Sequence, residues 1–216
     1  MTKGYVGLGG DGELILYIGI RGSDLSARHN QARMAVELRY WRVEDADAQE
    51  RAIAESLDHL LPWMPWAADE PKPLEARVAM LREWEAERLA GTGEYFAVWL
   101  DGALVGSCGL HRRIGPGGVE IGYWIHPRHL RRGLATEVAR QLCERAFAEP
   151  GVDRVEIHHD RANVASGGVP PKLGFEHVGD TRRARQAPSE EGVERVWRLS
   201  REAWTARRGS PPPARS

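Results

Sequence analysis

The residues best placed for chemistry form a short basic segment with a glycine at its centre, Leu-Arg-Arg-Gly-Leu-Ala-Thr at positions 130–136. An apolar strand pattern precedes it and a helical pattern follows, so the segment marks the start of a helix. Backbone N–H groups in the first turn of a helix have no intrahelical partner and carry the positive end of the helix dipole, which suits phosphate oxygens. The neighbouring arginines add positive charge. The spacing predicts a phosphate site, and it fits equally a capped helix with solvated arginines.

The apolar patterns place this segment within a chain that mixes strands and helices. Apolar residues that step by four predict a helix over 134–148. Asp101-Gly102 between two apolar runs predicts a tight hairpin turn. The other patterns predict, in chain order, a strand over 38–42, helices within 43–61 and over 73–89, strands over 95–100, 103–110 and 119–126, a strand over 154–158, a short helix over 164–173, and strands over 175–178 and 194–199.

This order of elements predicts an α/β (α+β) single domain, with a mixed, mostly antiparallel central sheet flanked by helices. The strands on either side of the 134–148 helix predict a parallel crossover. Met34 stands just before the first strand of the pattern, so we expect it to be the natural start. Residues 1–33 are then an upstream extension or a disordered arm, and the domain covers 34–204. The proline-rich tail over 205–216 is expected to be disordered.

Composition excludes several classes of function. The formal net charge of -1 gives no support for nucleic-acid binding. Cys108 and Cys143 form no metal-ligand spacing, so no metal site is expected. The longest apolar run, residues 14–20, is far too short to span a bilayer, and no signal peptide is evident, so we expect a cytoplasmic protein without a membrane partner.

Two segments resemble those of a known family. Residues 130–135 resemble motif A of the GNAT acetyltransferases, Q/R-x-x-G-x-G/A, and depart from it at the first position, where Leu130 stands. Residues 163–175 resemble the N-x-x-S-x-x-V-x-x-K-L-G-F segment of the RimJ/RimL-like branch, and residues 120–125 resemble its fourth strand. The resemblance covers about residues 37–199. Its motifs are specific to the family and leave the substrate open.

The resemblance implies acetyl-CoA as the cofactor and a primary amine that attacks the thioester directly. A strand N–H, that of Ile125, would then polarise the thioester carbonyl. Asn163 would hydrogen-bond the pantetheine arm and Lys172 would reach the cofactor phosphates, although a solvated lysine fits equally. The remaining cofactor-binding residues implied are those of the phosphate segment, namely Arg131, Arg132, Gly133, Leu134, Ala135 and Thr136.

Two residues are the candidate catalytic groups. Glu120 alternates with apolar neighbours, so it points to the opposite face of the sheet, where it could act as the base; a solvent-facing strand carboxylate is the plainer interpretation. Ser166 resembles the serine of the branch near the CoA sulfur and is the candidate acid, with helix capping as its alternative. Three histidines could assist proton transfer, although a structural role is commoner: His126, His158 and His159.

The acceptor pocket is expected in the loop between the first two helices. Trp63, Trp66 and Glu70 combine aromatic faces with a carboxylate, which suits a cationic amine. His111 and its basic neighbours favour an acceptor with an anionic group instead. The acceptor is therefore a small-molecule amine or a protein N-terminus, and the protein a monomer or homodimer. A non-catalytic acyl-CoA-binding sensor or partner module is the alternative to an enzyme.

Overall fold

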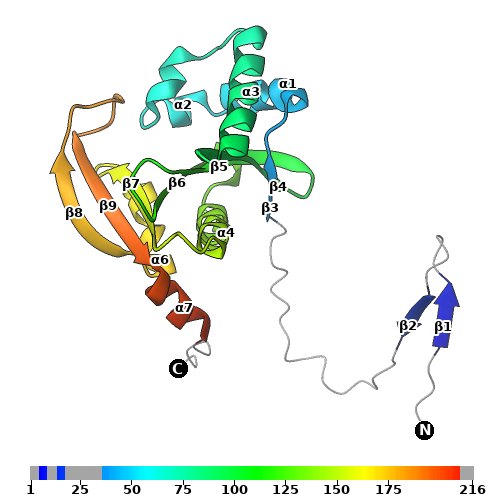
Figure 1. The fold of residues 1–216 in the computed structure, drawn as a ribbon. Helices are drawn as coiled ribbons and strands as arrows, with labels where there is room; N and C mark the ends of the chain where they lie inside the picture. Colours follow the sequence, from blue (N-terminus) through cyan, green and yellow to red (C-terminus); the bar gives the residue numbers. More distant parts are fainter. Residues whose placement is uncertain (1–4, 9–13, 18–35, 210–216) are drawn as a thin grey trace. The chain divides into compact units, whose positions relative to one another are not determined.

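The computed structural model describes residues 5–8, 14–17 and 36–209. It divides into one unit over Met1–Met34 and a second over Ala35–Ser216. The second unit contains a seven-stranded sheet in the order β3-β4-β5-β6-β7-β9-β8 (Figure 1). Its strands are β3 (Val36–Tyr40), β4 (Gly93–Leu100), β5 (Ala103–His111), β6 (Gly118–Ile125), β7 (Arg154–Asp160), β8 (Glu176–Arg182) and β9 (Val193–Ser200). Only β6 and β7 pair in parallel, so the sheet is mixed and mostly antiparallel, as predicted.

Helices cover both faces of the sheet. Figure 1 shows α1, α2 and α3 on one side of the sheet and α4 on the other. The helical segments are η1 (Val43–Asp45), α1 (Ala46–Ala54), α2 (Leu57–Leu60), η2 (Pro65–Asp69), α3 (Leu74–Ala90), η3 (Pro127–His129), α4 (Leu134–Ala148), α5 (Val164–Gly167), α6 (Pro170–Leu173) and α7 (Arg201–Gly209). In the described part of the chain, no helix has the length and apolar character needed to cross a membrane.

The main core lies between α4 and the sheet. Leu134, Val138, Leu142 and Ala146 of α4 are at most 2 % exposed, which confirms the face predicted from their spacing of four. Burial of such a face supplies most of the stability of a helix in a folded protein. The sheet side of this core is made of alternate, buried residues of the central strands, Leu110, Val119, Ile121 and Val155 among them. α4 therefore packs against one face of the central strands and supports them.

The strands β6 and β7 separate soon after they begin. Their pairing is limited to Gly118–Arg154, Val119–Val155 and Glu120–Glu156, at the start of each strand. From Ile121 onward β6 pairs only with β5, while β7 pairs only with β9. The sheet is thus split by a wedge between β6 and β7, which widens toward the end of β6. Irregular backbone follows at that end and leads directly into α4.

Three segments differ from the sequence-based expectation. Residues 1–33, expected to be an upstream extension or a disordered arm, include the paired strands β1 (Tyr5–Leu8) and β2 (Leu14–Tyr17); the rest of that segment, like the expected start at Met34, lies outside the described residues, and both interpretations of the segment stay predictions. The short helix expected over 164–173 is two helices, α5 and α6, because Pro170 and Pro171 start a new one.

The C-terminal tail is the third difference. Its disorder was expected from residue 205, whereas α7 extends to Gly209, and residues 210–216 lie outside the described part. The tail is ordered there because its neighbours anchor it to α4. Trp204 stacks on Phe147 at 5.9 Å between ring centroids. Arg201 donates hydrogen bonds to the carbonyl oxygens of Phe147 and Glu149 at the end of α4, and of Val152 in the loop that follows.

Candidate active site

The wedge exposes backbone groups that a ligand can pair with. The N–H of His126 donates to the carbonyl oxygen of Val105 at 2.8 Å, so it points toward β5. Because successive residues of a strand point their backbone groups to opposite sides, the N–H and C=O groups of Tyr123 and Ile125 point away from β5, into the wedge. β7 has separated from β6 at this level and provides no partner. An extended ligand can therefore pair with β6 as an additional strand.

The start of α4 lies at the end of the same wedge. Arg131 and Gly133 have left-handed backbone conformations, with φ of 58° and 78°, and no side chain caps the helix. The two left-handed residues and the free first turn aim successive N–H groups outward, as in anion-binding sites. A Cβ built on Gly133 meets no atom within 4 Å, so the space in front of the helix is open. This open space and the basic residues beside it fit the phosphates of a CoA molecule.

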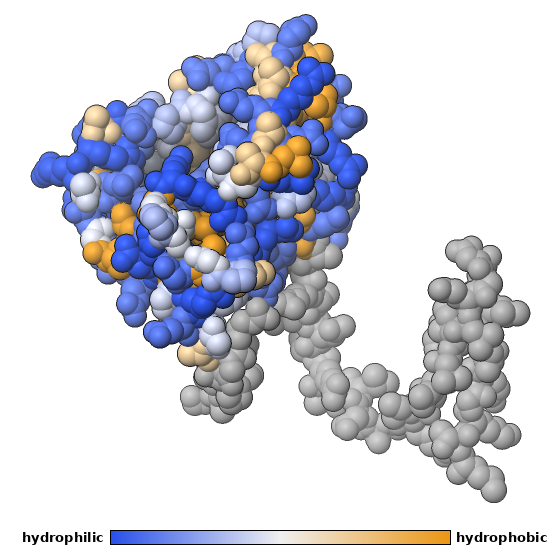
Figure 2. All heavy atoms as spheres, viewed as in Figure 1, coloured by the Kyte–Doolittle hydropathy of each residue, from blue (hydrophilic) through white to orange (hydrophobic). Residues whose placement is uncertain are grey.

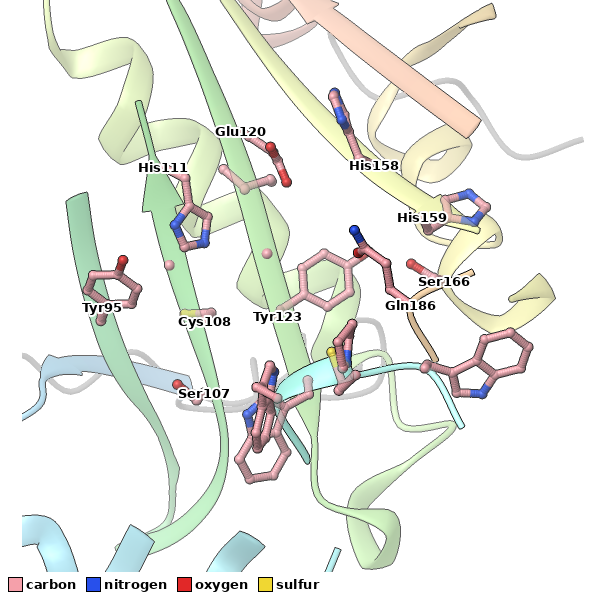
Figure 3. A pocket seen from close by; sticks show the side chains of 18 of the residues that line it. Tyr95, Ser107, Cys108, His111, Glu120, Tyr123, His158, His159, Ser166 and Gln186 are labelled. Atoms are coloured by element: carbon pink, nitrogen blue, oxygen red, sulfur yellow. The ribbon is translucent and has the colours of Figure 1, made fainter. Parts of the chain in front are cut away.

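A cavity of about 610 Å³ lies on the other side of β6, between the sheet and the α1–α3 layer (Figure 3). Several residues singled out in the sequence line it, namely Trp63, Trp66, Glu70, His111, Glu120, Asn163, Ser166 and the two histidines His158 and His159. The other predicted cofactor residues, Ile125, Arg131 to Thr136 and Lys172, do not line it. Lys172 is exposed on α6, which packs beside α4. The predicted residues thus fall into a group at the start of α4 and on α6, and a group around the cavity that includes the predicted pantetheine partner Asn163.

Glu120 lies on the cavity side of β6, as its alternation with Val119 and Ile121 predicted, and is only 8 % exposed. Its carboxylate is bound by the guanidinium of Arg113, with N–O distances of 2.8 and 2.6 Å. Burial raises the pKa of Glu120, but the hydrogen bonds and positive charge of Arg113 outweigh burial, so the pKa lies below its usual value. The carboxylate therefore stays charged at neutral pH and is a weak base.

His111 lies opposite Glu120 on the neighbouring strand β5 and lines the same cavity. Burial, and then the charge of Arg113, lowers the pKa of His111, so the ring is neutral at pH 7. Its ring meets that of Tyr95 edge to face, with centroids 5.4 Å apart. A neutral ring does not attract an anion, so His111 gives no support for the anionic acceptor that its basic neighbours suggested.

Ser166 and Asn163 lie where β7 ends and α5 begins. The side-chain oxygen of Asn163 accepts a hydrogen bond from the N–H of Ser166 at 3.1 Å, so Asn163, and not Ser166, caps α5. The hydroxyl of Ser166 is left for other partners. Tyr123 points toward Ser166 in Figure 3, and its own hydroxyl is buried without a hydrogen-bond partner among the described residues. Burial raises the pKa of Tyr123, and the adjacent Ser166 offsets part of that rise.

The acceptor end of the cavity combines aromatic rings with a carboxylate that already has a partner. Trp66 and Met64 pack with Trp124 against Ile53 and Leu60. Glu70 lies 2.6 Å from the guanidinium of Arg77, and both side chains are almost fully buried, at 4 % and 0 % exposed. The charge of Glu70 is therefore neutralised by Arg77, and it cannot attract a cation as strongly as the sequence suggested.

A second group of polar residues was missed in the sequence. The carboxylate of Asp160, at the end of β7, accepts hydrogen bonds from the backbone N–H groups of Ala162, Glu191, Gly192 and Val193. Burial raises the pKa of Asp160, but these hydrogen bonds outweigh burial and lower it. Asp160 thereby anchors the loop between β8 and β9, which contributes Arg183, Gln186 and Glu190 to the cavity wall. Such long-range capping leaves no periodic signal in a sequence.

The same loop reaches the α1–α3 layer. The N–H of Ser189 donates to the carbonyl oxygen of Pro62 at 3.0 Å, so the β8–β9 loop and the loop that carries Trp63 and Trp66 meet beside the cavity.

Two of the candidate histidines, His126 and His159, hold structural positions. Nδ1 of His126 accepts a hydrogen bond from the N–H of Arg128, and Nε2 of His159 accepts one from the indole of Trp197. In the described part of the chain, no cluster of three potential ligands could hold a metal ion.

Comparisons with known proteins identify relatives of this chain. The sequence model of the acetyltransferase (GNAT) domain matches residues 35–176. A curated relative is "Putative ribosomal N-acetyltransferase YdaF" of Bacillus subtilis, 27 % identical over 153 residues, which cover 68 % of this chain and 81 % of the relative.

Solved structures share the fold. RimL, a ribosomal L7/L12 alpha-N-protein acetyltransferase solved in complex with coenzyme A, has a TM-score of 0.71 at 16 % identity, over 78 % of this chain and 95 % of RimL. RimJ of Mycobacterium smegmatis, in complex with a CoA disulfide, has a TM-score of 0.68 at 23 % identity, over 77 % of this chain and 82 % of RimJ.

Proposed function

The chain belongs to the GNAT acetyltransferase family and uses acetyl-CoA, and from this premise we propose that it acetylates a primary amine by direct attack on the bound thioester. One observation carries the proposal. The wedge between β6 and β7 opens at the uncapped start of α4, and Tyr123 and Ser166 link it to a cavity large enough for a separate acceptor. Donor and acceptor sites that meet in this way favour a ternary complex over a covalent enzyme intermediate.

The donor side of this proposal rests mainly on the backbone. The first-turn N–H groups of Leu134, Ala135 and Thr136, with Arg131 and Arg132, hold the phosphates. The free backbone groups of Tyr123 and Ile125 pair with the pantetheine arm, and Asn163 contacts it from the other side of the wedge. The N–H of Ile125 donates to the thioester oxygen as negative charge develops there. Lys172, exposed on α6, interacts with the phosphates from outside.

The acceptor side combines charge with aromatic surface. Glu120 remains anionic because of Arg113. Unlike Arg77 beside Glu70, the Arg113 side chain is 65 % exposed, so solvent screens its charge and the carboxylate of Glu120 still attracts the ammonium form of the acceptor into the cavity. Trp63 and Trp66 provide faces against which the amine and its carbon chain pack. Ser166 donates a proton to the departing thiolate, since its hydroxyl lies at the junction of wedge and cavity and is not needed for capping.

The acceptor class follows from chemistry and from the relatives. The aromatic and anionic lining selects a cationic primary amine, on a small molecule or at a protein N-terminus. The names of YdaF and RimL, which refer to ribosomal N-acetylation, support the N-terminal class. A panel of N-terminal peptides and small amines, assayed by thiol release from acetyl-CoA, tests the proposal. Release with at least one amine is expected; binding of acetyl-CoA without release across the panel would identify a binding module instead.

A further inference from the structure

A buried carboxylate holds a histidine at the edge of the cavity. Glu156 and His158 alternate on β7, so their side chains lie on the same face, the face that also carries Glu120 on β6. Nε2 of His158 lies 2.8 Å from Oε2 of Glu156. The other oxygen of Glu156 is bound by Arg198 at 2.7 Å, and Glu156 is 4 % exposed. The carboxylate is therefore fixed on both sides.

This pairing determines which ring nitrogen is free. A charged carboxylate only accepts hydrogen bonds, so Nε2 of His158 carries the proton and Nδ1 has the lone pair. Burial raises the pKa of Glu156, but His158 and Arg198 outweigh burial and lower it, so the carboxylate is charged at neutral pH. A buried carboxylate that orients an imidazole in this way is the arrangement by which proteins prepare a histidine to accept a proton.

The free nitrogen faces Glu194 on β9, and both residues line the cavity. His158 lines the cavity and is neither fully buried nor fully exposed, with 18 % of its side chain accessible. Nδ1 lies 3.7 Å from Oε2 of Glu194 on β9, too far for a hydrogen bond but close enough to stabilise an imidazolium. Figure 3 shows Glu120 and His158 on neighbouring strands at the same end of the cavity. An ammonium drawn in by Glu120 therefore arrives beside His158.

Glu120 itself is poorly suited to take the proton. Both of its oxygens are engaged by Arg113, and its pKa is lowered. His158 has a partner on only one nitrogen at hydrogen-bond distance. Three carboxylates face His158, each with its own cationic partners. They are Glu156 on the same strand with Arg154 and Arg198, Glu120 from the β6 side with Arg113, and Glu194 on β9 with Arg183 of the β8–β9 loop.

We propose that His158 is the proton acceptor for the acceptor amine, with Glu156 as the residue that positions it. Nδ1 of His158 takes a proton from the ammonium, which becomes the neutral amine and attacks the thioester carbon. The C–N bond forms and the C–S bond breaks. The second proton that the nitrogen loses reaches the departing thiolate through the hydroxyl of Ser166, so the products are the amide and the thiol of CoA. The proton on His158 then passes to solvent, with Glu194 stabilising the imidazolium meanwhile. This inference rests on the proposed amine acetylation.

The test is His158→Gln, measured with an amine that the parent acetylates. The Gln amide can still donate to Glu156, so the local structure is retained. We expect kcat to fall about 100-fold with unchanged acetyl-CoA affinity by calorimetry. Up to the pKa of the amine, the residual rate should increase about tenfold for each unit by which the pH is raised. The reason is that the variant can use only amine that has already lost its proton to solvent. Added imidazole should restore part of the activity.

His177→Gln is the matched control. Nε2 of His177 lies 2.7 Å from Asp180, a similar carboxylate pairing, but His177 does not line the cavity. It should leave kcat and its pH dependence unchanged.

Glu156→Gln should lower kcat, and added imidazole should not restore the activity, because His158 is still present but misoriented. Unchanged kcat in His158→Gln, or a loss with the parental pH profile and no rescue, overturns the role of His158. A parent inactive on every amine overturns the proposed function, and the inference with it.

Discussion

Glu120 and Arg113 form a two-point ion pair beside the cavity, with N–O distances of 2.6 and 2.8 Å. Arg113 thus keeps the carboxylate charged in spite of its burial. The cavity consequently contains a fixed negative charge that does not titrate near pH 7. The charge of Glu120 is available to attract a cationic acceptor. The same lowered pKa makes the carboxylate a weaker base.

Glu120→Gln is therefore expected to weaken amine binding more than catalysis. We expect KM for the amine to rise about tenfold, which corresponds to a loss of about 1.4 kcal/mol of attraction. Because the pKa of Glu120 is lowered, its charge is present throughout the neutral range and is lost only as pH falls through that lowered value. The variant should therefore change KM without changing the pH profile of kcat between pH 6 and 8.

The control is Glu37→Gln, which breaks an exposed ion pair with Arg39 on the edge strand β3. It should leave both kinetic constants at parental values. A fall in kcat with Glu120→Gln, together with a shifted pH profile, would instead give Glu120 the role of the base.

Gly133→Val should abolish much of the cofactor binding. The left-handed φ of 78° strains any other residue, and the new side chain projects into the open space in front of α4. We expect acetyl-CoA affinity, measured by calorimetry, to fall at least about tenfold. Gly91→Val is the matched control. Gly91 lies at the end of α3 with a similar left-handed φ of 70°, and a Cβ built on it also meets no atom within 4 Å. If it weakens acetyl-CoA binding equally, the site does not lie at Gly133.

Asp160→Ala should destabilise the protein by about 3 kcal/mol, because four backbone N–H groups lose a charged acceptor. The pKa of Asp160 is lowered in the folded state, so its contribution is present above the unfolded pKa of about 3.9 and is lost as pH falls through the folded value. Urea unfolding should show a large difference between variant and parent at pH 7 that shrinks as pH falls below the unfolded pKa of about 3.9.

Asp180→Ala is the comparison, since Asp180 pairs with Arg195 on the surface. It should cost much less stability than Asp160→Ala, because solvent screens an exposed ion pair. An equal loss in the two variants would mean that Asp160 is no special anchor of the β8–β9 loop.

Ser189→Pro should loosen the cavity wall, because proline lacks the N–H that donates to Pro62. We expect a several-fold rise in KM for the amine, consistent with about 1 kcal/mol for one hydrogen bond, and an unchanged KM for acetyl-CoA. Ser189→Ala retains the N–H and should behave as the parent. Steady-state kinetics of the pair will show whether the contact between the two loops contributes to acceptor binding.

The sequence predicted most of the fold because its signals are local. The helix expected over 134–148 is α4, Leu134–Ala148. Gly133 marks the start of this helix, and the apolar spacing marks its extent. Strand ends were less accurate: β7 extends to Asp160, beyond the predicted 158. The order in α7 could not be predicted, because it depends on Trp204 and Arg201 reaching the distant end of α4.

The candidate site was predictable to the extent that it is built from consecutive backbone. The start of α4 is such a site. The partners of Glu120 and Glu70 were not predictable, since Arg113 and Arg77 are seven residues away, on turns or on other elements. Glu156 and His158 did carry a signal: they alternate with the apolar Val155 and Ile157, which places both polar side chains on one face.

The wedge has a consequence for how the reaction cycle ends. On the proposed role of Tyr123 and Ile125, their backbone groups pair with the pantetheine arm, which is the same in acetyl-CoA and in free CoA. These contacts therefore bind reactant and spent cofactor alike. Product inhibition by CoA is then built into the sheet, and substitutions on β6 that retain the backbone N–H groups leave it in place. Faster turnover would have to come from weaker phosphate binding at α4.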